Sequence, residues 1–228
     1  MSLETRGRSS GRPCTPTGTM RTISGGIVRV LDRTQGRIPQ PWRTVVDWLV
    51  TIAVAIAFVL MFEAQVAKPY RIPSPSMEPT LHCARPVAHC QGRFSDRVTA
   101  NRLAYRFGDP QRGHVVVFNA PRAAERCALG DGGSTFVKRI VGLPGELISE
   151  REGTIFVDGK RLSEPYVDPS LRGTSDGSWP RVAPGHYFVL GDNRTHSCDS
   201  RTWGTVPRNN LIGPVMLTYW PPRRVAFR

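Results

Sequence analysis

Lysine is scarce in this chain, although the chain is strongly basic. Of its 228 residues, 31 are Lys or Arg and 18 are Asp or Glu, which gives a formal net charge of +13. Only Lys68, Lys138 and Lys160 are lysines. Chemistry that needs an amine base therefore has three candidate positions.

Long helical periodicity is also missing after residue 68, and this absence argues against an all-α fold. The chain has 22 Gly and 20 Pro, a content typical of short strands joined by turns. β-rich runs recur instead, at residues 114–118, 135–143, 154–160, 186–190 and 215–220. The Asp158-Gly159 pair in the third run is a hairpin turn signal. We therefore predict a mostly β protein built from antiparallel sheets.

Signals for metal-dependent or cofactor-dependent chemistry are weak. The five histidines lack the H-E-x-x-H spacing of a zinc enzyme. A G-x-S-x-G match at Gly173–Gly177 lies in a polar loop, without the flanking strand and helix that a nucleophile elbow needs. The apolar fraction of 39% excludes complete disorder. We expect a globular domain with no cofactor and no metal.

One apolar run stands out near the N-terminus. Thr44–Phe62 contains a single charge, Asp47, and as a helix it would span roughly 28 Å, close to the thickness of the hydrocarbon core. The run has no polar face, which disfavours a buried helix of a soluble core. A cleaved signal is disfavoured by the long preceding segment and by the poor small-x-small motif in Glu63–Ala67. We predict a retained transmembrane signal-anchor with its exit at residues 44–67.

The anchor would separate residues 1–43 from residues 68–228. The first 43 residues contain eight arginines and two acidic residues without a sustained apolar period, which predicts a disordered basic arm. A nucleic-acid-binding arm is the alternative, but no aromatic or module motif supports it. Because arginines before a span favour the cytoplasmic side, we expect residues 68–228 to be extracytoplasmic.

Four cysteines fall in the predicted extracytoplasmic part. An oxidising exterior favours disulfides, and a bond between Cys83 and Cys90 closes only a short loop. A histidine precedes each of these two cysteines, so a zinc site is the alternative. Cys127 and Cys198 would form the second disulfide.

Ser76 lies in a proline-rich stretch shortly after the predicted anchor. The prolines of Ile72–Leu81 fix φ and bias the residues before them to extended forms, so this segment is stiff. Ser76 follows Phe62 by 14 residues and lies at most about 50 Å from the bilayer edge. A reactive serine would act near the membrane surface there, although a merely polar loop serine is the alternative.

Lys138 is the one lysine inside an apolar predicted strand. Strand alternation places it on the face of Phe136 and Ile140, opposite Arg139. Burial on that face would lower its pKa from about 10.4 and provide a neutral amine that can act as a base. A strand lysine that extends its amine to water is the alternative.

A third cluster, Gly191–Gly204, is dense in hydrogen-bonding side chains and follows the predicted strand 186–190. Asp199 and Arg201 are two residues apart, so they share a face of an extended chain and favour an ion pair. A polar turn with a local salt bridge is the alternative.

These three clusters, in this order after an anchor, resemble the type I signal peptidases, or leader peptidases. The resemblance runs from about residue 44 to residue 220, and its motifs are Pro73–Leu81, Val137–Gly145 and Gly191–Arg201. The single span is similar to that of the smaller Gram-positive-type members. The resemblance implies antiparallel β sheets with a barrel-like catalytic core, and a serine peptidase with a Ser–Lys dyad.

The resemblance also implies roles for individual residues. Ser76 would be the nucleophile and Lys138 the general base. The hydroxyl of Ser74 would join the backbone N–H of Ser76 in an oxyanion hole. Ser197 would hydrogen-bond the lysine and orient it.

Asp199 and Arg201 match the family's structural ion pair beneath the site, and Arg139, next to the base, would only support it. Two positions depart from the family's motifs, because His114 stands where Asp is usual and His196 where Asn is usual. Since His196 adjoins the lysine-orienting serine, it is the departure closer to the site.

We therefore predict a single-pass membrane endopeptidase that removes signal peptides from exported preproteins. Its N-terminus would be cytoplasmic, its catalytic domain extracytoplasmic, and its partners the preproteins and the lipid bilayer, with no nucleic acid. We expect a monomer. Two alternatives remain: an inactive membrane-anchored scaffold that binds signal peptides or lipid, and a self-cleaving Ser–Lys protease of related fold.

Overall fold

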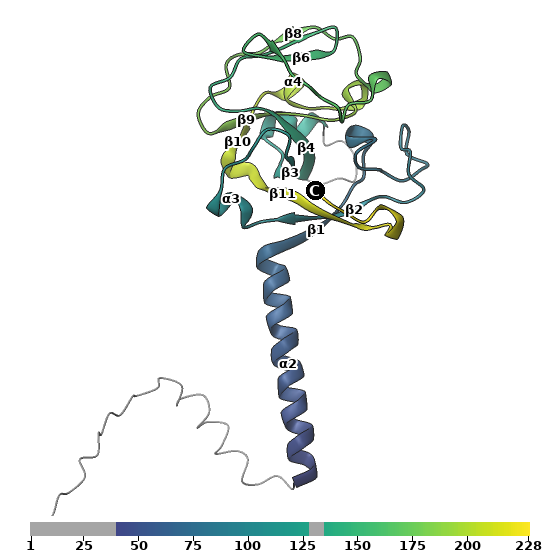
Figure 1. Ribbon diagram of the computed structural model, residues 1–228, viewed down its shortest axis with the longest axis vertical. Helices are drawn as coiled ribbons and strands as arrows, with labels where there is room; N and C mark the ends of the chain where they lie inside the picture. Colours follow the sequence, from purple (N-terminus) through teal and green to yellow (C-terminus); the bar gives the residue numbers. More distant parts are fainter. Residues whose placement is uncertain (1–39, 128–134) are drawn as a thin grey trace, which may run out of the picture. The chain divides into compact units, whose positions relative to one another are not determined.

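The computed structural model describes residues 40–127 and 135–228 (Figure 1). Most of the predicted basic arm, residues 1–39, therefore lies outside the described residues. The chain divides into two compact units, Met1–Ala55 and Ile56–Arg228. The second unit contains both sheets and every candidate site residue.

Helix α2 (Gln40–Val66) has 27 residues and contains the apolar run. Among the described residues it is the one helix long and apolar enough to cross a membrane, and the side chains of its stretch Thr44–Met61 are exposed. It begins four residues before the predicted span, because a helix continues beyond the part that matches the hydrocarbon core. At 1.5 Å per residue it is about 40 Å long.

The larger sheet is antiparallel throughout. Its strands run in the order β1-β2-β11-β3-β4-β9-β10, and β12 pairs with β11. The strands are β1 (Ala67–Arg71), β2 (Arg97–Asn101), β3 (Val115–Asn119), β4 (Thr135–Gly142), β9 (His186–Leu190), β10 (Val206–Pro207), β11 (Leu211–Trp220) and β12 (Ala226–Phe227). Two short helices, α3 (Ala104–Phe107) and α4 (Ser200–Trp203), flank these strands in the chain.

The smaller sheet is also antiparallel, with the order β7-β6-β5-β8. Its strands are β5 (Ile148–Arg151), β6 (Thr154–Val157), β7 (Lys160–Arg161) and β8 (Gly177–Ser178). The hairpin β6–β7 turns at Asp158 and Gly159, whose φ angles are 48° and 79°. Two consecutive positive φ angles are the mark of the tight turn that this residue pair predicts. The prediction of an antiparallel, mostly β fold is confirmed.

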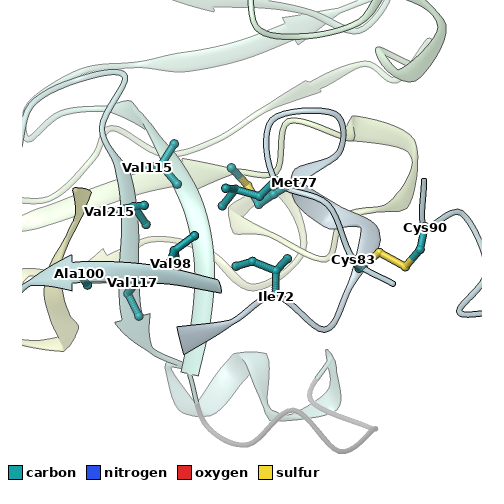
Figure 2. Close-up of a cluster of buried hydrophobic side chains, with 10 residues drawn as sticks. Ile72, Met77, Cys83, Cys90, Val98, Ala100, Val115, Val117 and Val215 are labelled. Atoms are coloured by element: carbon teal, nitrogen blue, oxygen red, sulfur yellow. A yellow bond between two sulfur atoms is a disulfide. The ribbon is translucent and has the colours of Figure 1, made fainter. Parts of the chain in front are cut away.

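A hydrophobic cluster joins the proline-rich segment to the larger sheet (Figure 2). Ile72 and Met77, which both belong to this segment (Ile72–Leu81), pack with Val98 of β2 and with valines of β3 and β11. Both side chains are almost completely buried. The residues between them are therefore fixed at both ends by an apolar side chain that is buried in the core.

Both disulfides are present in the structure. Cys83 bonds to Cys90 inside the same cluster (Figure 2). Cys127 bonds to Cys198. His82 pairs with the buried carboxylate of Glu78. Because Cys83 and Cys90 are bonded to each other, the structure favours the disulfide over the alternative zinc site. The described residues contain no group of three or more His, Cys, Asp or Glu side chains that could hold a metal ion.

The number of reactive thiols tests this pairing. The chain has five cysteines, and the two disulfides leave only Cys14 as a thiol. In denaturant without reductant, we expect a thiol reagent to titrate one group per chain, and five after reduction. A Cys14→Ser variant should titrate none before reduction. Three or more thiols in the unreduced wild-type protein would contradict the pairing.

Candidate active site

Ser76 lies in a single 3₁₀ turn, η1 (Pro75–Met77), that follows an extended residue, Ser74. Pro75 occupies the start of the turn, where its fixed φ and missing N–H are tolerated. The buried side chain of Met77 and the hydrogen bond from Ile72 N to Asp96 O, 3.0 Å, hold the turn against the core. Ser76 is consequently held against the core and only 5% exposed.

Lys138 lies in the middle of β4, a central strand of the larger sheet. It pairs with Val116 of β3 in the antiparallel register, and the next residue pairs with Leu190 of β9. Its side chain is 4% exposed and its Nζ lies 5.9 Å from the ring centre of Phe136, on the predicted strand face. The alternative of a solvated lysine is therefore wrong.

The two side chains meet across 62 residues of sequence. Lys138 Nζ lies 2.6 Å from Ser76 Oγ, which is a short hydrogen bond in a buried environment. A neutral amine at this position can accept the serine proton directly. This contact is the central feature of the site.

The surroundings of Lys138 favour the neutral amine. Burial lowers the pKa of Lys138 from 10.5 to about 8, because the low-dielectric interior penalises the ammonium. The charges of Asp199 and Asp192 oppose this shift, and the charge of Arg201 adds to it. About half of the Lys138 side chains are then uncharged near pH 8, so the reactive fraction increases as the pH rises through that value.

Ser74 contributes a second hydroxyl beside that of Ser76. Its Oγ lies 3.2 Å from Ser76 Oγ. The backbone N–H of Ser76 is one of the first amides of the 3₁₀ turn, and such amides have no partner within their own turn. Two donors therefore stand next to Ser76 Oγ.

The loop Gly191–Arg201 packs directly against the nucleophile turn. Asn193 donates from its backbone N to Ser76 O, 3.1 Å, and from its Nδ2 to Pro75 O, 3.2 Å. A Cβ on Gly191 would lie 2.4 Å from Ser76 O and 2.2 Å from Ser197 Oγ. Only glycine allows this close approach, so residue 191 keeps the loop and the turn together.

Asp192 links the strand of Lys138 to the segment that follows Ser76. It is fully buried, and Arg139 binds it through Nε at 2.8 Å and Nη2 at 2.6 Å. Thr80 donates its hydroxyl to the same carboxylate at 2.5 Å. Sequence reasoning placed Arg139 on the opposite face from Lys138 but did not identify Asp192 as its partner.

Asp199 and Arg201 form an ion pair with distances of 2.9 and 3.0 Å. The Asp199 carboxylate is fully buried and also accepts a hydrogen bond from Gly191 N at 3.1 Å. Arg201 reaches Glu150 of the smaller sheet at 3.5 Å. The pair thus supports the loop. After burial, the charge of Asp199 has the largest effect on the pKa of Lys138.

Ser197 lies in the site without the contact expected of it. Its Oγ is buried next to Gly191 and has no hydrogen-bond partner, while Lys138 Nζ bonds to Ser76. The expected hydrogen bond from Ser197 to the lysine is therefore not present in this structure.

Two further carboxylates were missed by sequence reasoning. Glu78 is fully buried and accepts hydrogen bonds from Cys83 N at 3.1 Å and Gln91 N at 3.0 Å. Glu164 is buried with Arg194, whose Nη1 lies 3.2 Å from it. An acidic residue inside a proline-rich apolar segment was the one available signal for Glu78, and nothing nearby in the sequence pointed to Glu164.

The two histidines that depart from the family's motifs lie outside the dyad. His114 accepts or donates a hydrogen bond with Tyr105 Oη at 3.2 Å. The ring of His196 stacks on that of His89 with centroids 3.6 Å apart. No histidine hydrogen-bonds Ser76 among the residues that the structure describes, whereas Lys138 does.

Comparison with known proteins gives a consistent result. The model of the family "Signal peptidase, peptidase S26" matches residues 45–220. A probable signal peptidase I-2 of Synechocystis is 36% identical over 176 residues, covering 77% of this chain and 73% of that protein. The signal peptidase I of Mycobacterium tuberculosis is 36% identical over 219 residues, covering 77% and 72%.

A solved structure of a signal peptidase I from Enterococcus faecalis is also similar to this chain. It shares 33% identity with a TM-score of 0.40, and the match covers 48% of this chain and 98% of that chain.

The depressed pKa of Lys138 can be measured directly, because the chain has only three lysines. With ¹³C-labelled lysine, we expect one NMR signal to titrate with a midpoint of about 8, since burial destabilises the ammonium. That signal should be missing from a Lys138→Met variant, which provides the assignment. A Lys138 midpoint above 10 would contradict the buried, neutral amine.

Proposed function

The chain belongs to the signal peptidase family, peptidase S26, and we propose that Ser76 and Lys138 are its nucleophile and general base. It is a membrane serine endopeptidase that removes signal peptides from exported proteins. The observation that carries the residue assignment is the 2.6 Å contact between Lys138 Nζ and Ser76 Oγ in a buried site. A serine hydroxyl is a weak nucleophile until a neighbouring base takes its proton.

The first step forms a tetrahedral intermediate. Neutral Lys138 accepts the Ser76 hydroxyl proton as Ser76 Oγ attacks the carbonyl carbon of the scissile amide. The carbonyl electron pair moves to the oxygen, which becomes an oxyanion. The backbone N–H of Ser76 and the hydroxyl of Ser74 are the donors that stabilise this charge, because they already stand beside Oγ.

The second step releases the mature protein. The Lys138 ammonium donates its proton to the leaving amide nitrogen as the C–N bond breaks, which leaves the signal peptide esterified to Ser76. Neutral Lys138 then accepts a proton from water, whose oxygen attacks the ester carbonyl. The proton returns to Ser76 Oγ when the ester bond breaks, so the enzyme is regenerated without a cofactor.

The loop around Gly191 supports this geometry. Asn193 holds the turn of Ser76, and the Asp199–Arg201 pair holds the loop that presses on it. We assign these residues a supporting role, because they bind the backbone around the dyad and not the reacting atoms. We also propose the lysine-orienting role for Ser197, whose buried hydroxyl has no hydrogen-bond partner in the structure.

We further propose that α2 anchors the enzyme as a single-pass protein with its N-terminus in the cytoplasm. The arginines before the helix favour that side, and the catalytic unit then meets preproteins as they leave the membrane.

The extended backbone before Ser76 can pair with an extended substrate as an added strand. We propose that the enzyme acts as a monomer.

An inactive signal-peptide-binding scaffold is the alternative that the dyad disfavours. A scaffold has no need of a buried lysine next to a serine, and burying a lysine without a partner is costly. A self-cleaving Ser–Lys protease is disfavoured because the family model matches this chain from the apolar helix to the end of β11.

Removing either member of the dyad should abolish cleavage. We expect Ser76→Ala, Lys138→Ala and Lys138→Arg each to lower kcat by about 10⁴-fold or more, measured on a purified preprotein. Arginine fails because its guanidinium does not lose a proton near neutral pH.

A Lys160→Arg variant is the matched control and should keep full activity, because Lys160 lies exposed in β7 of the smaller sheet. Circular dichroism must show that the inactive variants are folded. Substantial cleavage by any of the three dyad variants would refute the assignment.

The orientation predicts which residues a protease can reach. In intact spheroplasts, added protease should digest residues 68–228 and spare epitope tags placed on the arginine-rich arm, because the arm is cytoplasmic. Lysed spheroplasts are the control and should lose both. Protection of the large domain in intact cells would reverse the proposed topology.

A further inference from the structure

Residues 221–228 follow β11 and lie beyond the last residue that the family model matches. They include a 3₁₀ turn, η6 (Pro222–Arg224), and β12, which pairs Phe227 with Leu217 of β11. Arg228 N also donates to Met216 O at 2.9 Å. Figure 1 shows this yellow segment turning back along β11, with which β12 pairs. It is therefore an ordered part of the catalytic unit.

Arg224 binds the aspartate that brackets the nucleophile segment. Asp96 is fully buried, its backbone O accepts from Ile72 N at 3.0 Å, and its Oδ2 accepts from His82 N at 2.9 Å. Both ends of the segment that contains Ser76, at Ile72 and His82, thus hydrogen-bond to Asp96. Arg224 contacts that carboxylate through Nε at 3.1 Å and Nη2 at 3.0 Å.

Arg224 and Arg228 then converge on one carbonyl. Arg224 Nη2 donates to Thr80 O at 3.2 Å, and Arg228 Nη2 donates to the same oxygen at 2.7 Å. A carbonyl oxygen has two lone pairs and can accept both bonds at once. Arg228 is itself held by Thr218 of β11, whose hydroxyl accepts from its Nε at 3.2 Å.

Thr80 also faces the other half of the dyad. Its hydroxyl donates to Asp192, which binds Arg139, the neighbour of Lys138 in β4. Thr80, four positions after Ser76, therefore connects the segment 221–228 to β4, the strand that contains Lys138. A shift of Thr80 would move Ser76 relative to Lys138, and a displacement of 1 Å can lower a rate by about 10²-fold.

We propose that Arg224 and Arg228 are positioning residues for the peptidase reaction. They hold Thr80 and Asp96, and through these residues they keep the Ser76 hydroxyl within reach of the Lys138 amine. The proposal rests on the proposed dyad, because it concerns the geometry of those two side chains. Neither arginine hydrogen-bonds Ser76 or Lys138 itself.

Three methionine variants test the proposal. Arg224→Met and Arg228→Met remove the donors to Thr80, whereas Arg223→Met removes a neighbouring exposed arginine that makes no hydrogen bond or ion pair with the described residues. The matched control therefore accounts for the loss of one positive charge. Two rates are measured: cleavage of a peptide with a small-x-small motif, and acylation of Ser76 by a β-lactam-type inhibitor.

We expect Arg224→Met and Arg228→Met to lower kcat and the acylation rate by about tenfold or more, with KM within about twofold of wild type. Arg223→Met should behave as wild type. Arg228→Lys should recover most of the loss, because a lysine amine can still donate to Thr80 O.

Arg224→Met leaves a buried carboxylate without its cation and can fail to fold. The paired variant Asp96→Asn/Arg224→Met removes both charges, so it can still be assayed if Arg224→Met does not fold. Arg228→Met can also still be assayed, because Arg224 continues to bind Asp96 in it. Wild-type kcat in both Arg228→Met and the paired variant, or a change in KM alone, would overturn the proposal. Absence of cleavage and of Ser76 acylation in the wild-type enzyme would instead refute the proposed dyad.

Discussion

The structure depends on burying one amine away from water and within hydrogen-bond distance of a serine hydroxyl. Lys138 must be buried for its pKa to fall to about 8, but burial alone would leave its ammonium form without a hydrogen-bond partner. A central strand of the larger sheet provides the burial, and the nucleophile turn provides the partner at 2.6 Å. The remaining features of the catalytic unit keep these two backbones at a fixed separation.

Buried arginine–carboxylate pairs supply most of that rigidity. They involve the loop after β9 and are Arg139–Asp192, Arg194–Glu164 and Arg201–Asp199. Each would cost about 3–5 kcal/mol if one partner were removed, because a buried charge would remain uncompensated. The arginine-rich composition thus has a structural use in this unit, since a guanidinium binds a carboxylate and a backbone carbonyl in one plane.

The fold was predictable where local pattern and tertiary role agree. The apolar strands β3, β4 and β9 and the Asp158-Gly159 hairpin follow from composition and turn chemistry. Strands β1 and β2 were missed, because Ala67–Arg71 and Arg97–Asn101 are polar and become strands only through pairing with each other and with β11. The short strands β8, β10 and β12 have two residues each, too few to show a period.

The sequence by itself determined the apolar helix, the β class, and the candidates Ser76 and Lys138, because stiffness, periodicity and the rarity of lysine are local or compositional properties. Only the tertiary structure decided that these side chains meet, that Asp192 joins both halves of the site, and that Arg224 and Arg228 reach Thr80. Such contacts join residues more than 50 positions apart. Their partners are chosen by strand order and packing, which no local stretch of sequence contains.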